Sequence, residues 1–291
     1  MAWNVGPPMG ITDCHVHINP LWEMRPDALR MLAQIDPANA RYLEDARAFL
    51  EYLDACGVDR AVLINYVASE VIGYTEAANT FVSEYVQPNP ERLIAVGGMR
   101  HDHPDPESEV VHLARDLGIR ALKLHPPHQL FRPNAYVDGA APTLKALYDA
   151  CARHGLPIIF HTGTSVFPRA RNRFSDPLFI EDVALDFPDL TIVLAHGGRP
   201  IWMETAVFLA RRFPNVWLEV SGVPPARLLD YFPQLPRLAD KVLFGTDWPG
   251  PGVKDIRANL DAFRALPIPR EAQQQILEEN PLRVFPRRAP S

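Results

Sequence analysis

Ile11-Thr-Asp-Cys-His-Val-His-Ile18 is a short, largely apolar run that ends at Asn19 and Pro20, and this pattern is typical of a buried strand. Seven similar runs follow along the chain, each bounded by residues that favour turns. They are Ala61–Tyr66, Leu93–Gly98, Ala121–Pro126, Pro157–Gly163, Thr191–Gly198, Val216–Gly222 and Val242–Pro249. Successive runs start 25 to 50 residues apart, which leaves room for a helix and two loops after each strand.

The gaps between these runs carry helical patterns. Pro142–His154 places Leu144, Leu147 and Cys151 on one stripe and is followed by Gly155, as expected for a helix with proline near its start and glycine past its end. The other predicted helices are Arg41–Cys56, Glu70–Val86, Pro106–Leu117, Leu178–Phe187, Pro200–Phe213, Pro225–Ala239, Val253–Leu266 and Arg270–Glu279.

A strand followed by a helix, eight times, predicts a parallel sheet closed into a (β/α)8 TIM barrel. The strands are nearly continuous apolar runs, as expected where both faces of a sheet are covered. An open, doubly wound sheet also alternates strands and helices, but eight units in 291 residues favour the barrel. We expect a single domain over residues 1–291, with the barrel at about 11–266 and a C-terminal helix and tail at 267–291.

Composition narrows the class of protein. The chain is 47% hydrophobic and 22% charged, with a net charge of −6, so nucleic acid and anionic membrane surfaces are unfavourable partners. No apolar run approaches about 18 residues, and Met1–Gly10 lacks the charge and apolar core of a secretory signal. The three cysteines form no C-x-x-C motif. We therefore expect a cytoplasmic protein without disulfide bonds.

The first strand carries the first candidate metal ligands. Side chains alternate along a strand, so Asp13, His15 and His17 share one face, and Cys14 and Val16 are expected to face the helices. Two neighbouring imidazoles can chelate a divalent metal, and Asp13 could hydrogen-bond one of the ligand rings. The alternative is a pair of hydrogen-bonded core histidines.

Three further candidates stand where later strands end. His161 lies in Phe160-His-Thr-Gly, His196 in Ala195-His-Gly-Gly and Asp247 in Gly245-Thr-Asp-Trp-Pro. The carboxyl ends of barrel strands meet at one face and carry the active site. A buried, unpaired aspartate is costly, so it needs a cation or hydrogen-bond donors. A ligand set of His15, His17, His161 and Asp247 leaves room for water and is typical of a catalytic site.

These motifs, together with Lys123-Leu-His-Pro and Asn280-Pro-Leu-Arg-Val-Phe, resemble the amidohydrolase family 2 group of metal-dependent hydrolases over about residues 11–286. The resemblance implies a TIM barrel with a divalent metal at its mouth. It also implies that His15, His17, His161 and Asp247 are ligands and that His196 is a catalytic neighbour. Three histidines and a carboxylate favour Zn²⁺, while Mn²⁺, Fe²⁺ or Co²⁺ would also fit. A homodimer is common in such barrels.

Lys123 and His125 are two residues apart and therefore share a face. In binuclear relatives a carboxylated lysine on the fourth strand bridges two metals, and Lys123 occupies a comparable place. Otherwise Lys123 pairs with Asp13 or Asp247 or contacts a substrate carboxylate. His125 is a second candidate for substrate binding, or it only caps its strand.

Basic and aromatic residues after the strands suggest a small anionic substrate. Arg199 follows His196 and is the strongest candidate for a carboxylate clamp. Trp248 is the candidate wall for a planar substrate, and the loop Asn19–Ala40 is a candidate lid. Further candidate carboxylate-binding residues are Arg132, Arg169, Arg171 and Arg173, and further candidate wall residues are Trp22 and Phe131.

The predicted activity is metal-dependent hydrolysis of a small amide or lactone that carries a carboxylate. A metal lowers the pKa of bound water toward about 7. Asp247 would then act as general base and later as general acid, while His196 would polarise the carbonyl group. The main alternative is non-oxidative decarboxylation of an aromatic or unsaturated acid. A metal-free lactonase and a barrel that only binds a ligand are further alternatives.

Overall fold

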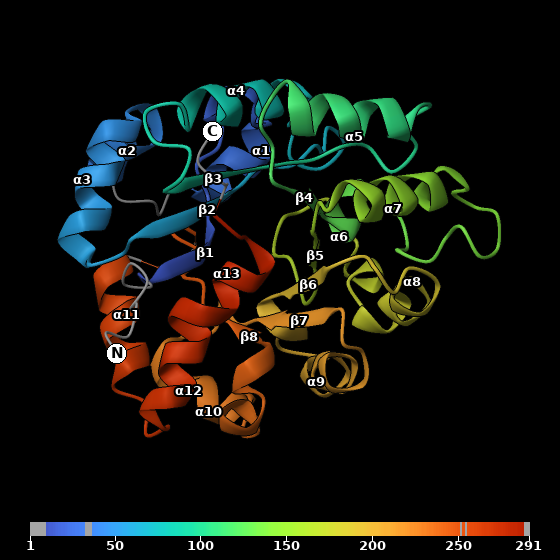
Figure 1. Ribbon diagram of the computed structural model, residues 1–291. Helices are drawn as coiled ribbons and strands as arrows, with labels where there is room; N and C mark the ends of the chain where they lie inside the picture. Colours follow the sequence, from blue (N-terminus) through green and yellow to red (C-terminus); the bar gives the residue numbers. More distant parts are fainter. Residues whose placement is uncertain (1–9, 33–36, 251, 254, 288–291) are drawn as a thin grey trace, which may run out of the picture.

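The computed structural model describes residues 10–32, 37–250, 252–253 and 255–287. The first nine residues, four residues of the expected lid and the last four residues of the tail lie outside these ranges. Eight parallel strands form one sheet in chain order, surrounded by helices, which confirms the (β/α)8 TIM barrel (Figure 1). The strands are β1 (Thr12–Val16), β2 (Arg60–Ile64), β3 (Leu93–Gly97), β4 (Ala121–Leu124), β5 (Ile158–His161), β6 (Ile192–Ala195), β7 (Val216–Glu219) and β8 (Val242–Leu243).

The barrel closes between β1 and the segment that follows β8. The backbone N–H of Cys14 donates to Phe244 O at 2.9 Å, and that of Asp247 donates to His15 O at 2.8 Å. Each predicted strand was longer than the observed one, because its last residues leave the sheet and form the loops that carry the candidate site residues.

The helices form the outer layer (Figure 1). They are α1 (Pro26–Leu29), α2 (Ala40–Glu44), α3 (Ala46–Cys56), α4 (Ala77–Tyr85), α5 (Pro106–Arg115), α6 (Pro126–Gln129), α7 (Thr143–His154), α8 (Ile180–Asp186), α9 (Met203–Arg212), α10 (Leu228–Tyr231), α11 (Ile256–Arg264), α12 (Arg270–Gln274) and α13 (Asn280–Val284). A π-helical turn, Gln275–Glu279, joins α12 to α13, so the last helix runs beyond its predicted end.

Three other predicted helices differ from the structure by more than a few end residues. The range Glu70–Val86 is helical only from Ala77, where α4 begins. The range Arg41–Cys56 is interrupted at Asp45, whose side chain caps the N-terminus of α3. The range Pro225–Ala239 contains only the short α10 between 3₁₀ turns, because its prolines remove backbone donors. Among the described residues no helix is long and apolar enough to cross a membrane.

The barrel interior and the layer between strands and helices form separate hydrophobic clusters. A register irregularity between Asp13 and Val16 alters the side-chain alternation of β1. Cys14 therefore packs in the interior cluster with Val62 and Ile94, and the expectation that it faces the helices is wrong. Val16 packs in the outer cluster as expected.

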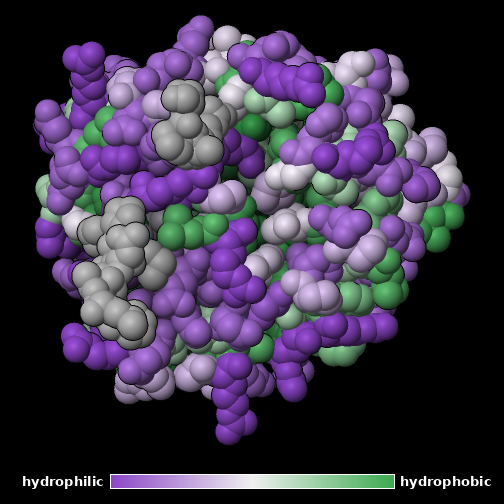
Figure 2. All heavy atoms as spheres, in the orientation of Figure 1, coloured by the Kyte–Doolittle hydropathy of each residue, from purple (hydrophilic) through white to green (hydrophobic). Residues whose placement is uncertain are grey.

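The amino-terminal end of the barrel is covered by the end of the chain. Val284 and Phe285 belong to the interior cluster, and Arg60, the first residue of β2, donates to Phe285 O at 2.7 Å. In the view of Figure 2, hydrophobic side chains are scattered among hydrophilic ones on the surface. The opposite end of the barrel, where the strands terminate, is left open for the site.

Candidate active site

His15 is fully buried at the end of β1 and is held by a carboxylate. Its Nδ1 lies 2.8 Å from Oε2 of Glu219, the last residue of β7, while its Nε2 has no hydrogen-bond partner among the described residues. Burial, together with the charge of Lys123, holds the pKa of His15 well below its usual value. The neutral ring donates its Nδ1–H to Glu219 and keeps a lone pair on Nε2.

His17 and Asp247 face one another beside His15. His17 Nδ1 lies 3.2 Å from the carbonyl oxygen of Ile64, which can only accept, so this nitrogen carries the proton of the neutral ring. His17 Nε2 and His15 Nε2 then present lone pairs at 3.2 and 3.7 Å from Asp247 Oδ1. Burial opposes ionisation of Asp247, but its contact with the His17 ring and the nearby charge of Arg199 lower its pKa to about 2.

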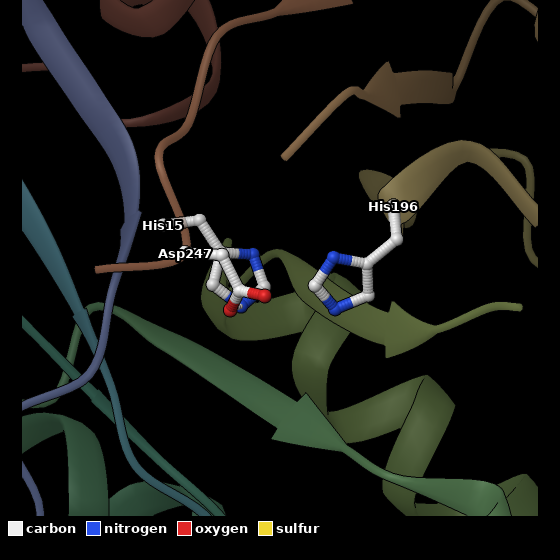
Figure 3. Close-up of side chains that lie close together, drawn as sticks. All are labelled: His15, His196 and Asp247. Atoms are coloured by element: carbon white, nitrogen blue, oxygen red, sulfur yellow. Dashed lines mark ion pairs between the residues drawn. The ribbon is translucent and has the colours of Figure 1, made fainter. Parts of the chain in front are cut away.

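This donor set fits a divalent cation. Two nitrogen lone pairs and an ionised carboxylate repel one another unless a positive charge lies between them. A carboxylate on the far nitrogen of a ligand histidine, as Glu219 is on His15, is a common feature of metal sites. His15, His196 and Asp247 each offer a ligand atom, and these atoms lie within 4.8 Å of one another (Figure 3).

His196 follows β6 in a left-handed backbone conformation, with φ of 65°, and Asp247 has φ of 67°. Such conformations are costly for residues other than glycine and cluster at functional sites. Ser221 donates its hydroxyl hydrogen to Glu219 Oε2 at 2.9 Å, so its oxygen accepts from His196 Nδ1, also at 2.9 Å. In neutral His196 the lone pair is therefore on Nε2, and the ring cannot donate to a carbonyl group from that atom.

His161, at the end of β5, lies beside this cluster. Its ring centroid is 4.7 Å from that of His196 and 3.9 Å from that of His125, on which it stacks. Its buried Nε2 has no partner among the described residues. This free nitrogen is compatible with the predicted ligand role. The group of three ligand atoms that lie within 4.8 Å of one another comes from His15, His196 and Asp247, however, and includes neither His17 nor His161.

Lys123 is buried at the end of β4, and its Nζ has no hydrogen-bond partner in the described part of the chain. It therefore does not form the ion pair with Asp13 or Asp247 that was one of its expected roles. Burial lowers the pKa of Lys123 to about 8, although the charges of Glu219 and Asp247 oppose this shift. The amine is thus a cation at neutral pH that lacks an anionic partner.

Glu219 is the main site residue that sequence reasoning missed. It accepts from His15 and from both the N–H and the hydroxyl of Ser221, and burial raises its pKa to about 7. The sequence did contain a signal, because Glu219 is a charged residue at the end of the otherwise apolar run Val216–Glu219. It stands two residues after Trp217, so both side chains lie on the same face of β7. Asp13 does not perform the role expected of it, because it accepts from Thr246 and from the backbone of His15.

A row of stacked rings forms one side of the site. His125 lies between Tyr66 and His161, with ring centroids 5.0 and 3.9 Å away, and stacks on His128 at 3.5 Å. His128 was not predicted as a site residue. Its Nδ1 lies 3.2 Å from the Tyr66 hydroxyl oxygen, and its Nε2 lies 2.7 Å from Ser165 Oγ.

Arg199, the predicted carboxylate clamp, lines the cavity. It donates to Thr164 O at 3.2 Å, and its Nη2 lies 3.8 Å from Asp247 Oδ2. Its Nε is buried without a partner among the described residues. Gly222 leaves the room that this side chain needs, because a Cβ there would lie 2.5 Å from a guanidinium nitrogen.

Four other arginines predicted near the mouth do not line the cavity. Arg169 pairs with Asp27 at 2.9 Å and Arg132 with Asp138 at 2.5 Å, while Arg171 and Arg173 are exposed. Only Arg199 of this predicted group reaches the cavity among the described residues.

The predicted aromatic walls are also elsewhere. Trp248 is fully buried and packs on Phe49 and Tyr52 of α3, with both pairs of ring centroids 5.6 Å apart. Because the chain turns at Asp247, the next side chain points to the helix layer, and the prediction that Trp248 binds substrate is wrong. Trp22 is 73% exposed, and Phe131 stacks on His101.

A cavity of about 330 Å³ opens above these groups, a volume suited to a small ligand. Seven of the candidate residues contribute to its polar lining: His17, Lys123, His125, His161, His196, Arg199 and Asp247. The site thus combines histidine nitrogens that carry lone pairs, the ionised carboxylate of Asp247 and the positively charged side chains of Lys123 and Arg199 around one small cavity.

Comparison with known proteins agrees with this chemistry. A family model described as amidohydrolase matches residues 12–287. A 2-pyrone-4,6-dicarboxylate hydrolase of Comamonas testosteroni is 32% identical, over 35% of this chain and 46% of its own length. The chain thus matches less than half the length of that relative.

Two solved structures share the fold. An uncharacterised TIM-barrel protein of Bordetella bronchiseptica is 26% identical, with a TM-score of 0.74 over 94% of this chain and 97% of its own. A 5-carboxyvanillate decarboxylase variant of Novosphingobium aromaticivorans, solved with bound manganese, is 16% identical. Its TM-score is 0.64 over 94% of this chain and 96% of its own, and at this identity the likeness concerns the fold alone.

Proposed function

The chain belongs to the amidohydrolase family, and on that premise we propose that it is a metal-dependent hydrolase of a small lactone or amide that carries a carboxylate. The observation that carries the proposal is the meeting of the Nε2 lone pairs of His15 and His17 with the ionised carboxylate of Asp247. A divalent cation would balance the repulsion between these groups. When bound, it would polarise the substrate carbonyl group and acidify water.

The proposed ligands are His15, His17, His161 and Asp247, and the proposed ion is Zn²⁺. His161 is included because its buried Nε2 has no partner in the described part of the chain. His196 is the alternative fourth ligand, since it lies in the closest group with His15 and Asp247.

The chain's own residues would perform the proton transfers. Asp247 is ionised at neutral pH and would accept a proton from the attacking water, then deliver it to the leaving oxygen or nitrogen. His196 presents a lone pair on Nε2, so it would orient this water by accepting its other hydrogen. Lys123 and Arg199, which have unpartnered nitrogens, would hold the substrate carboxylate, and His125 would line the substrate's ring or chain.

A decarboxylase is the second candidate function, because a carboxylate held by Lys123 and Arg199 could itself be the group that leaves. The solved relative with bound manganese is a decarboxylase, whereas the relative from Comamonas testosteroni is a hydrolase. In either case the proposed substrate is a small organic anion.

The test combines metal analysis with a screen of lactones, amides and aromatic acids in ¹⁸O-labelled water. We expect one equivalent of metal per chain and the label in the product. Release of CO₂ without label in the product would reject hydrolysis, and full activity after complete removal of metal would reject the role of the ion. A measured two equivalents of metal would point to a carboxylated Lys123.

Variants test the residue roles. Asp247→Asn should lower the rate by about 10²–10⁴-fold, while Asp240→Asn on the surface serves as the matched control. Metal retention in His161→Ala and in His196→Ala identifies the fourth ligand, because only removal of a true ligand should release the ion. Unchanged turnover in Asp247→Asn would refute the proposed base.

A further inference from the structure

The cavity has walls of two chemical kinds. Its polar end is built by residues at the strand ends, among them Lys123, and by Arg199 and Asp247. Another part, which we call the apolar wall, comes from the loops that follow β1, β2 and β5. The apolar wall consists of Leu21, Met24, Leu32, Ile72 and Phe167.

The apolar wall is a packed structure. Met24 and Ile72 belong to a hydrophobic cluster separate from the barrel core, and Leu21, Leu32 and Phe167 pack against it. Backbone bonds fix the loops to one another, since the N–H of Arg25 donates to Ile72 O at 2.7 Å. The wall is therefore held by contacts within the chain itself and can receive an apolar group without rearrangement.

The cations lie only at the other end. Among the described residues that line the cavity, Lys123 and Arg199 are the only lysine and arginine, and both have unpartnered nitrogens. Arg169, which follows β5 and could have reached over the wall, is instead paired with Asp27. In the cluster that forms the wall, the Tyr74 hydroxyl lines the cavity and has no hydrogen-bond partner among the described residues. A second carboxylate placed against the apolar wall would thus exchange its hydration for a bond to a neutral hydroxyl and gain no cation, which is costly.

We infer that the site selects a monocarboxylate with an apolar arm and disfavours a dicarboxylate of similar size. The carboxylate binds between Lys123 and Arg199, and the arm lies against the apolar wall. This inference rests on the proposed function for the identity of the site. It narrows the substrate class and separates this chain from a hydrolase of a small dicarboxylate.

Binding of three non-reactive acids tests the inference without requiring turnover. Benzoate, 4-propylbenzoate and benzene-1,4-dicarboxylate are titrated into the purified full-length protein by calorimetry. We expect 4-propylbenzoate to bind roughly tenfold or more tighter than benzoate, since burial of three carbons is favourable. We expect the dicarboxylate to bind no more tightly than benzoate. Equal affinities for all three, tighter binding of the dicarboxylate, or no measurable binding of 4-propylbenzoate would overturn the inference.

Two neighbouring substitutions locate the arm. Leu21→Lys places a cation in the apolar wall and should remove the preference for the propyl group while strengthening binding of the dicarboxylate. Trp22→Lys, at a residue that is 73% exposed and outside the wall, is the matched control and should change neither affinity. Leu21→Ala should lose part of the propyl preference and keep the affinity for benzoate, which gives a second readout if the lysine variant unfolds. A full propyl preference in Leu21→Ala would contradict the placement of the arm.

The results separate this inference from the proposed function. A propyl preference without turnover of any lactone or amide would support the inference and reject hydrolysis. Hydrolysis of carboxylate-bearing lactones without a propyl preference would support the proposed function and reject the apolar arm.

Discussion

At the scale of single residues, Glu219 orients two histidines of the site, His15 directly and His196 through Ser221. It accepts hydrogen bonds from His15 and Ser221, and Ser221 in turn accepts from His196. One carboxylate thus directs the Nε2 lone pairs of two histidines toward the cavity. The local sequence around each histidine cannot set its tautomer, because the partner comes from another strand.

Glu219→Gln should weaken metal binding by about 10–100-fold, because the neutral amide holds the His15 ring less firmly and no longer raises its basicity. The measurement is metal content after dialysis against buffers of graded chelator strength. Glu204→Gln, at an exposed residue of α9, is the matched control. Equal metal affinity in both variants would show that Glu219 has no such role.

Lys123 predicts a pH dependence of anion binding. Its pKa is about 8 because burial disfavours the charged amine, so the cation is present below that pH and is lost above it. The affinity for benzoate should therefore fall as the pH rises from 7 to 9. Lys123→Met should bind benzoate more weakly, and its affinity should no longer depend on pH over this range. Lys145→Met, at an exposed residue of α7, should keep the wild-type pH dependence. A wild-type affinity that stays constant over this range would contradict the assignment.

At the scale of secondary-structure elements, breaks in the pattern matter more than the pattern itself. The apolar stripe across Arg41–Cys56 predicted one helix, but the chain is extended at Asp45 and a new helix begins there. Similarly, β1 contains an irregularity that a strict alternation of side chains would not show. Both departures depend on side chains that bond to nearby or distant backbone groups.

Asp45→Ala should lower the free energy of unfolding by about 1 kcal/mol, because Asp45 accepts from the N–H groups of Arg47 and Ala48 at the start of α3. Denaturant unfolding measures this change. Glu51→Ala, on the exposed face of α3, is the control and should stay within about 0.5 kcal/mol of wild type. A similar stability of both variants would refute the capping role.

At the scale of the whole molecule, the two ends of the barrel have different tasks. The amino-terminal end is filled by Val284 and Phe285 from the end of the chain, and the carboxyl-terminal end carries the cavity. This separation allows stability and activity to be changed independently.

Phe285→Ala should cost about 3–5 kcal/mol of stability, since it removes a buried ring from the barrel interior. The fraction of protein that remains folded should keep its metal and its affinity for benzoate, because the cavity lies at the other end. Phe208→Ala, at a residue of α9 that is 48% exposed, is the control for loss of a phenyl ring. Loss of ligand affinity in folded Phe285→Ala would show that the two ends are coupled.

The sequence by itself determined the barrel and most of the cavity's polar residues. Eight apolar runs at helix-length intervals leave few arrangements that bury them all, and residues at the ends of parallel strands must meet at one face. His17, Lys123, His161, His196, Arg199 and Asp247 were therefore predictable as neighbours and do line one cavity.

Only the tertiary structure decided which groups these residues contact. It replaced Asp13 by Glu219 as the partner of His15, and it moved Trp248 from the cavity to the helix layer. It also formed the apolar wall from three loops far apart in the chain. The physical reason is that hydrogen bonds and packing between distant segments depend on local irregularities and loop paths, which the periodicity of the sequence does not encode.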